Sequence, residues 1–389
     1  MYRNKYYSIC IILTLVVSLL LSNAVVCYAE EPAITAKAGV VMEATTGTVV
    51  YDKNMHEVLP PASITKVMTL LLIYEAMERG EILPDSVVTT SEHAANMGGS
   101  QVYLEVGEQQ TVETLIKCIC ISSANDACVA MAEYISGTED AFVEKMNKRA
   151  KELGMLDTNF VNCCGLDADG HVSSAYDVAL MSRELMQRFP QIMQYTTTWM
   201  DSMVHKTKNG ESEFGLTNTN KLIRQYEGIT GLKTGSTSKA MYCLSATASR
   251  NGTEIIAVVL AAPDTKNRFK EATSLLNYGF SVCKTYQDIH EDMEPVYVTV
   301  EQSMKQQVEL IPKEPFCYVS TEQEDFREIR EEIIVYDSIC APVKQGDELG
   351  MIQYYIQDKK IGTVMLVAKD EIKKAKYMDY LKELLKLLT

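Results

Sequence analysis

The chain has 389 residues, of which 47% are hydrophobic and 23% charged, and this is the composition of a folded globular protein rather than a disordered one. The length suggests two or three domains. The formal net charge of −15 at pH 7 argues against general nucleic-acid binding, because affinity for phosphates needs a basic face.

The first 29 residues predict a secretory signal peptide. Arg3 and Lys5 form a positive n-region, residues 9–21 form an apolar run, and Cys27-Tyr28-Ala29 resembles a small-residue cleavage site. The alternative is an uncleaved N-terminal anchor. We expect an exported protein whose mature chain begins at residue 30.

Cysteine and histidine spacing predicts no metal site. Cys10 and Cys27 fall within the signal segment, which leaves nine of the eleven cysteines, an odd number that cannot pair fully within one chain. No two C-x2-C pairs occur, and the five histidines form no H-E-x-x-H motif. Buried or free thiols are therefore the expectation.

Apolar periodicity predicts both strands and helices in the first 281 residues. Helical spacing from Ala62 to about Arg79 predicts a buried helix, and residues 111–190 are mostly helical in pattern. Breaks in this pattern fall at 122–125 and 162–170. The expected strands are 38–52, folded around Thr46-Gly47, then 231–234, 242–249 and 255–262, the last two joined at Asn251-Gly252, with a helix following over 267–280.

After residue 282 the pattern changes to short β-rich runs separated by turns. These runs are 296–300, 308–311, 333–336, 351–356 and 362–367. Their spacing predicts a small all-β sandwich over residues 282–370. Residues 371–388 are helical in pattern again.

Three short motifs carry the chemistry. Ser63-Ile64-Thr65-Lys66 places a serine and a lysine on one face at the start of a helix. A serine hydroxyl needs a base to become a nucleophile, and a lysine serves only if its amine is neutral, which burial and a neighbouring cation favour. Taken alone, this motif is common and can be a surface serine beside a solvated lysine.

The other two motifs make the pattern specific. Ser123-Ala124-Asn125 lies at a break between helical segments, and Lys233-Thr234-Gly235 opens a β-rich run. Gly235 has no Cβ, so a ligand can approach the strand backbone closely. S-x-x-K, an S-x-N motif and K-T-G in this order are typical of penicillin-binding proteins and class A β-lactamases.

With these motifs, the chain resembles the low-molecular-mass penicillin-binding proteins, specifically the serine-type D-alanyl-D-alanine carboxypeptidases. The resemblance runs from about Ala36 to Lys376. The resemblance implies an α/β (α+β) catalytic domain over residues 30–281, with an antiparallel sheet flanked by helices, followed by the β-sandwich. Further matching segments are PASITKVMT (61–69), ANDACVAMAE (124–133), LGMLDTNFVN (153–162), GHVSSAYDVALMSREL (170–185), GLKTGST (231–237), LLNYGF (275–280) and APVKQGDELG (341–350).

The resemblance also implies catalytic roles. Ser63 attacks the carbonyl of the penultimate D-alanine, Lys66 acts as its general base, and Ser123 relays a proton toward the leaving amine. The backbone N–H groups of Ser63 and Ser236 form the oxyanion hole. No metal or cofactor is needed, and β-lactams are expected as covalent inhibitors.

Substrate-binding roles follow in the same way. Asn125 holds Lys66 and the substrate backbone, while Lys233 supplies positive potential for the terminal carboxylate, to which Thr234 donates a hydrogen bond. Arg268 is a further candidate for that carboxylate, although an exposed helix arginine is the alternative. His171 matches a family position and is expected to be structural.

Some positions depart from the family pattern. Cys163-Cys164 stand where Pro-His is common, Ala240-Met241 stand where Ala-Gly is usual, and Thr219 replaces a basic residue found in some relatives. Two rival functions also remain. A class A-like β-lactamase would need a carboxylate base for deacylation, yet residues 140–230 contain no E-x-x-L-N, and a non-catalytic cell-wall scaffold would not need both Lys66 and Lys233.

The last segment, residues 371–389, predicts an amphipathic helix. Tyr377, Met378 and Leu381 share one face with Leu384, Leu385 and Leu388, and charged residues lie opposite. This pattern suits a helix lying in a membrane interface, and related enzymes are tethered in this way to the outer face of the cytoplasmic membrane. The alternative is a helix docked on its own domain.

Overall fold

The computed structural model describes residues 31–208, 210–322 and 324–381. The predicted signal peptide, residues 1–29, and the last eight residues of the predicted C-terminal helix lie outside these ranges.

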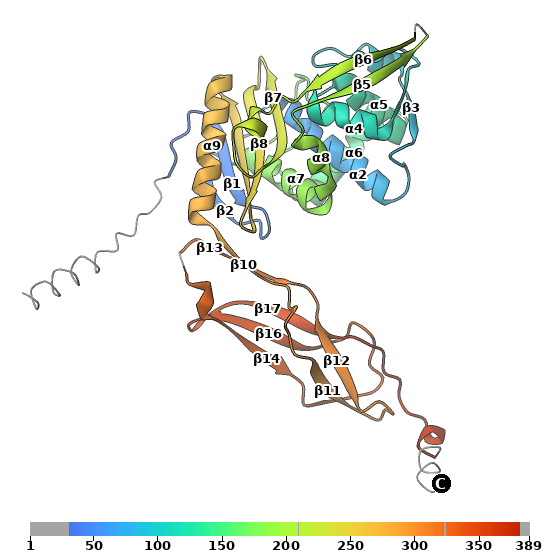
Figure 1. Cartoon of the computed structure of the whole chain (residues 1–389), viewed down its shortest axis with the longest axis vertical. Coiled ribbons are helices and arrows are strands. Elements are labelled where there is room, and N and C mark those ends of the chain that lie inside the picture. Colours follow the sequence, from blue (N-terminus) through green and yellow to red (C-terminus); the bar gives the residue numbers. More distant parts are fainter. Residues whose placement is uncertain (1–30, 209, 323, 382–389) are drawn as a thin grey trace, which may run out of the picture. The chain divides into compact units, whose positions relative to one another are not determined.

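A five-stranded antiparallel sheet forms the centre of the first 281 residues (Figure 1). Its strand order is β2-β1-β9-β8-β7, so the N-terminal hairpin pairs with a strand far along the chain. Asn251 and Gly252 both have positive φ in the β8–β9 turn, as the predicted hairpin requires. The strands are β1 (Ala38–Glu43), β2 (Val49–Lys53), β7 (Ile229–Thr237), β8 (Met241–Arg250) and β9 (Thr253–Ala262).

Helices cover both faces of this sheet. Helix α9 (Thr265–Val282) packs on one face, where its apolar side meets β1, β8 and β9. Helix α7 (Ala175–Arg188) packs on the other face and joins it to a larger helical core. The remaining helices of that core are α2 (Lys66–Glu78), α4 (Val112–Ile121), α5 (Asn125–Ser136) and α6 (Glu139–Glu152).

Helix α2 is the interior helix of this core. Residues 66–76 are all buried, which fits a helix that is apolar on nearly every side. The predicted break at 122–125 is confirmed between α4 and α5, and the fold class is confirmed as a whole. Shorter elements are η1 (Ala62–Thr65), α3 (Glu92–Ala95), η2 (Pro190–Ile192), α8 (Met193–Thr196), η3 (Lys221–Arg224) and the pairs β3 (Val87–Thr89) with β4 (Gln109–Thr111) and β5 (Met200–Thr207) with β6 (Gly210–Thr217).

From β10 to β17 the described residues form strands and turns, with one 3-10 turn, η4 (Phe326–Glu328). A six-stranded sheet has the order β14-β16-β17-β12-β11-β15, and a two-stranded pair, β10-β13, accompanies it. The ring of Phe316 in β13 stacks on Tyr354 in β16 at 3.8 Å and joins the two. The bounds are β10 (Lys284–Asp288), β11 (Val296–Glu301), β12 (Gln307–Pro312), β13 (Phe316–Ser320), β14 (Ile329–Val335), β15 (Ser338–Cys340), β16 (Glu348–Ile356) and β17 (Lys359–Ala368).

The start of the predicted C-terminal helix is wrong. Ile372 and Lys374 form isolated β-bridges with Val343 and Ser303, and helix begins only at Tyr377. Ile372 is buried in the core of the β-rich region, so packing overrides the helical pattern there. None of the described helices is long and apolar enough to cross a membrane.

Candidate active site

The turn that carries Ser63 is held in an unusual backbone conformation. Ala62, the residue before it, has a φ of +49°, which is rare for a residue with a side chain. The Thr65 hydroxyl donates to the Ala62 carbonyl at 2.8 Å and lies 2.7 Å from Nε2 of His171. Since Nδ1 of His171 accepts from the Val161 N–H, its Nε2 carries the hydrogen and donates to Thr65.

His171 therefore fixes the turn that carries Ser63, which is the structural use expected from the sequence. Burial lowers its pKa to about 4, so the ring is neutral at pH 7.

Lys66 lies beneath Ser63 with no exposed surface. Its Nζ is 3.0 Å from the Ser63 Oγ and donates to the Cys164 carbonyl at 2.6 Å. Asn162 shapes the loop that presents this carbonyl, because its Oδ1 accepts from the N–H groups of Gly165 and Leu166 at 2.7 and 3.1 Å. The sequence analysis missed both contributions, since a carbonyl leaves no side-chain signal, although an Asn three residues before a Gly is a turn signal.

Ser123 and Asn125 present polar atoms that have no partner among the described residues. Ser123 Oγ and Asn125 Oδ1 are both buried and unpaired. Asn125 is anchored from its other side, because its Nδ2 donates to the Gly98 carbonyl at 2.7 Å. An unsatisfied buried polar group costs about 1–3 kcal/mol, so these two atoms are arranged for a ligand to complete.

Strand β7 brings Lys233-Thr234-Gly235 against the Ser63 turn. A Cβ on Gly235 would lie 2.8 Å from the Ser63 backbone nitrogen and 3.0 Å from the Ala62 Cβ, so only glycine fits there. Thr234 Oγ1 donates to Thr219 Oγ1 at 2.6 Å, while the side chain of Ser236 is exposed at the end of the motif.

Lys233 is buried and donates to the Thr234 carbonyl at 3.3 Å. Burial, and next the charge of Lys66, lower its pKa to about 7. Neither lysine forms an ion pair with a described carboxylate. The buried amine of Lys233 thus provides positive potential that an anionic group can neutralise.

Arg268 reaches the same strand from α9 and is buried rather than exposed. Its Nη1 donates to the Gly235 carbonyl at 3.2 Å, its guanidinium lies over the rings of Tyr242 and Phe269, and its Nε has no partner among the described residues. The structure therefore places Arg268 behind the third motif, where it supports the strand and adds positive charge.

Residues 26–264 match the family described as D-alanyl-D-alanine carboxypeptidase. The chain belongs to this family. Residues 284–374 match the C-terminal domain of penicillin-binding protein 5.

Among the relatives of this carboxypeptidase family, DacF from Bacillus subtilis is 43% identical over 353 residues, which cover 91% of this chain and 90% of DacF. DacA from Escherichia coli is 30% identical over 90% of this chain and 88% of its own length.

Two solved structures illustrate the extent of the likeness. Penicillin-binding protein 5 from Haemophilus influenzae is 28% identical with a TM-score of 0.74, and the match covers 89% of this chain and all of that one. The Streptomyces K15 DD-transpeptidase is 29% identical with a TM-score of 0.61, and its match covers 65% of this chain and all of that one.

The nine cysteines of the described residues are all free thiols, and seven of them are buried. Among the described residues, no cluster of His, Cys, Asp or Glu side chains is placed to hold a metal ion.

Proposed function

We propose that this protein is a serine-type D-alanyl-D-alanine carboxypeptidase that removes the terminal D-alanine from peptidoglycan stem peptides and is acylated by penicillin. Family membership supports the reaction class. The observation that carries the mechanism is the contact of 3.0 Å between the Lys66 Nζ and the Ser63 Oγ, at a site whose second buried lysine, Lys233, has no carboxylate partner among the described residues.

In the acylation step, Lys66 takes the proton of Ser63 and the Oγ attacks the carbonyl of the penultimate D-alanine. The N–H groups of Ser63 and Ser236 receive the negative charge that develops on the carbonyl oxygen, and one such donor is typically worth about 2.7–4 kcal/mol of barrier. The Cys164 carbonyl holds the amine of Lys66 close to the serine throughout.

Leaving-group and substrate contacts come from the other two motifs. The unpaired Ser123 hydroxyl passes a proton to the departing D-alanine amine, and the free Asn125 oxygen accepts from a substrate N–H. The terminal carboxylate binds the Lys233 ammonium and the Thr234 hydroxyl. Arg268 adds to the positive electrostatic potential at this position. Water then hydrolyses the ester between the acyl group and Ser63, which releases the shortened peptide and regenerates the free enzyme.

The direct test is release of D-alanine from a synthetic stem peptide ending in D-Ala-D-Ala, with a peptide ending in D-Ala-L-Ala as the matched control. A fluorescent penicillin separates the rivals, because a β-lactamase would clear the label quickly and a scaffold would not label. Adding a glycine acceptor measures transfer against hydrolysis. Label retention without D-alanine release would contradict carboxypeptidase activity.

We further propose that residues 1–29 are removed on export, that the catalytic domain spans residues 30–281 and the β-sandwich 282–370, and that the mature protein acts at the outer face of the cytoplasmic membrane or in the cell wall. The membrane surface is the proposed partner of the C-terminal helix. Its first turn exposes Tyr377, Met378 and Leu381, with 80%, 56% and 39% of their surface open to solvent.

Deletion of residues 377–389 tests this anchor and leaves the buried Ile372 in place. The truncated mature protein is expected to lose binding to anionic liposomes and to keep its carboxypeptidase activity. Equal liposome binding by the truncated and full-length proteins would rule out the anchor.

A further inference from the structure

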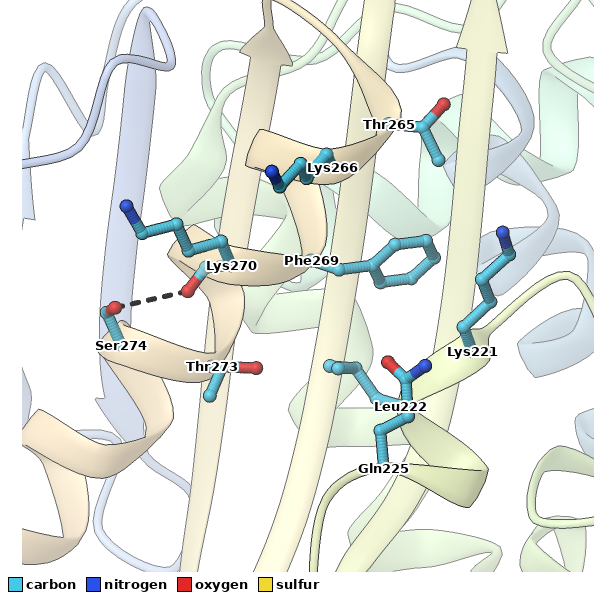
Figure 2. Close-up of a pocket in the computed structure, with 9 residues that line it drawn as sticks. All are labelled: Lys221, Leu222, Gln225, Thr265, Lys266, Phe269, Lys270, Thr273 and Ser274. Atoms are coloured by element: carbon cyan, nitrogen blue, oxygen red, sulfur yellow. Dashed lines mark hydrogen bonds between the residues drawn. The ribbon is translucent and has the colours of Figure 1, made fainter.

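A cavity of about 630 Å³ lies between η3 and the first turns of α9. Figure 2 shows the ring of Phe269 in its centre with Leu222 beside it, and both side chains are largely buried and make an apolar floor. Three lysines surround this floor: Lys221, Lys266 and Lys270. None of the lining residues belongs to the three catalytic motifs.

The cavity is lined by positive charge, although the chain as a whole is negatively charged. The sequence has 52 acidic and 37 basic residues, yet the cavity is lined by three lysines and by no acid. None of the three lysines forms an ion pair with a described carboxylate, whereas Lys313 and Lys369 in the β-rich region each do.

The cationic surface continues beyond Lys221. A neighbouring cavity of about 420 Å³ is lined by Trp199, Lys221, Arg224 and Gln225, and the Arg224 guanidinium lies over the Trp199 ring. The two cavities share Lys221 and Gln225, so together they form one surface of positive charge and aromatic faces.

Hydrogen bonds connect both walls of the cavity, η3 and α9, to strand β7, which carries the third motif. Asn220, which caps η3, donates to the Gly231 carbonyl of β7 at 3.0 Å, and its neighbour Thr219 is bonded to Thr234. On the α9 side, Arg268 reaches the Gly235 carbonyl while the next residue, Phe269, faces the cavity. A polymer lying across the cavity therefore runs close to the strand that binds the substrate terminus.

We propose that this cavity is an exosite for polymeric peptidoglycan, where the lysines bind carboxylates of stem peptides that neighbour the reacting one. The proposal rests on the proposed function. The reacting peptide presents its terminal carboxylate to Lys233, but the polymer carries further carboxylates, and a second contact raises the effective concentration of the chain end at Ser63. The apolar floor accepts the methyl groups and the sugar faces of the polymer.

The test compares two triple variants of the mature protein. One carries K221E, K266E and K270E, and the control carries K145E, K148E and K151E, three exposed lysines of α6 that change the net charge equally. Co-sedimentation with peptidoglycan freed of phosphate polymers measures binding without any need for turnover. We expect the exosite variant to bind about tenfold more weakly at low salt, with the difference shrinking at high salt, and the control to bind like the wild type.

Activity provides the second readout. D-alanine release from the polymer should fall about tenfold in the exosite variant, and release from a short peptide whose only anion is its terminal carboxylate should stay unchanged. Equal binding by the two triple variants would overturn the proposal, as would a difference seen only when phosphate polymers are retained, which would assign the lysines to phosphate instead. If the wild type releases no D-alanine from the short peptide, it is the proposed function that fails, and co-sedimentation still decides the exosite.

Discussion

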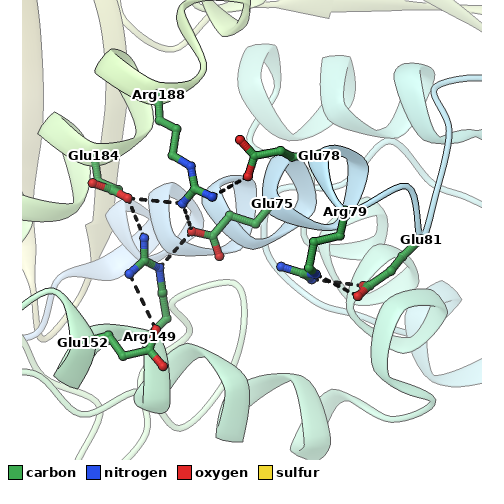
Figure 3. A network of polar contacts seen from close by, with 8 residues as sticks. All are labelled: Glu75, Glu78, Arg79, Glu81, Arg149, Glu152, Glu184 and Arg188. Atoms are coloured by element: carbon green, nitrogen blue, oxygen red, sulfur yellow. Dashed lines mark hydrogen bonds and ion pairs between the residues drawn. The ribbon is translucent and has the colours of Figure 1, made fainter. Parts of the chain in front are cut away.

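Helix α2 buries an ionisable side chain toward each of its ends, Lys66 at the first residue and Glu75 near the last. Figure 3 shows the Glu75 end, where Arg149 Nε and Arg188 Nη1 donate to its Oε1 at 2.8 and 2.7 Å. Both arginines also contact Glu184 of α7, so Glu75 ties three helices together. Within the part of the chain that the structure describes, Lys66 has only the Ser63 hydroxyl and the Cys164 carbonyl as hydrogen-bond partners.

The comparison distinguishes an ionisable group that stabilises the fold, Glu75, from one that is available for the proposed reaction, Lys66. A buried carboxylate with two guanidinium partners has its desolvation cost offset by charged hydrogen bonds. The amine of Lys66 has no carboxylate partner among the described residues and lies 3.0 Å from the Ser63 hydroxyl, which is the arrangement that the proposed proton transfer requires. The same helix therefore holds a structural end and a reactive end.

The largest effect is expected at the reactive end. Lys66→Met should lower the rate of penicillin acylation by about 10²–10⁴-fold, because the general base is lost. It should destabilise the protein less than Glu75→Gln does, since Lys66 is held by one hydroxyl and one carbonyl and a methionine keeps most of its buried aliphatic volume. Stopped-flow acylation and urea unfolding measure the two quantities, and a near-normal acylation rate would show that another group is the base.

The next effect is expected at the structural end. Glu75→Gln should reduce the free energy of unfolding by about 1.5–3 kcal/mol, the usual worth of hydrogen bonds to charged groups. Activity per folded molecule should change little. The matched control is Glu81→Gln, which breaks the exposed pair with Arg79 and should cost less than about 1 kcal/mol. Equal losses in the two variants would remove the distinction between the buried carboxylate of Glu75 and the exposed carboxylate of Glu81.

The third effect is a pH dependence from Lys233, whose pKa is lowered to about 7, mainly by burial. Binding of the substrate carboxylate needs the ammonium form, so KM should rise about tenfold between pH 6 and pH 8. In Lys233→Arg the guanidinium stays charged and the rise should vanish. A parallel rise in both proteins would assign the titration to a different group.

The same shift affects stability. The folded pKa of Lys233 lies below that of an unfolded lysine, so between about pH 7 and pH 10.5 the unfolded state binds more protons. This group therefore makes the free energy of unfolding rise with pH across that window and contributes no slope below it. Lys233→Met should lack this increment, and urea unfolding at pH 7 and pH 9.5 measures it.

Much of this structure was predictable from local signals in the sequence. Three features are encoded by the residue types at the feature itself, and each lies where it was expected: the Asn251-Gly252 turn, the break after Ile121 and the helix start at the S-x-x-K motif. The β5–β6 hairpin was not predicted, because its strands are rich in charged and exposed residues and lack a clean alternation. At the C-terminal end, the pairing of Ile372 with Val343 is a long-range contact that overrode the helical pattern.

The site shows the same division. The motifs predicted Ser63, Lys66 and Lys233 by type and spacing, whereas the Cys164 carbonyl and the Asn162 side chain that positions it depend on how a distant loop folds over α2. The hydrogen bond between Thr65 and His171 also depends on the tertiary fold, because the two residues are 106 positions apart in the sequence.

The position of the acyl group tests most directly whether Ser63 is the nucleophile. The mature protein is incubated with penicillin, digested and mapped by peptide mass spectrometry, with Ser63→Ala treated in parallel. We expect one adduct, on Ser63, and none in the variant, which should also release no D-alanine. An adduct on Ser123 or on any other residue, or retained labelling of Ser63→Ala, would contradict this expectation.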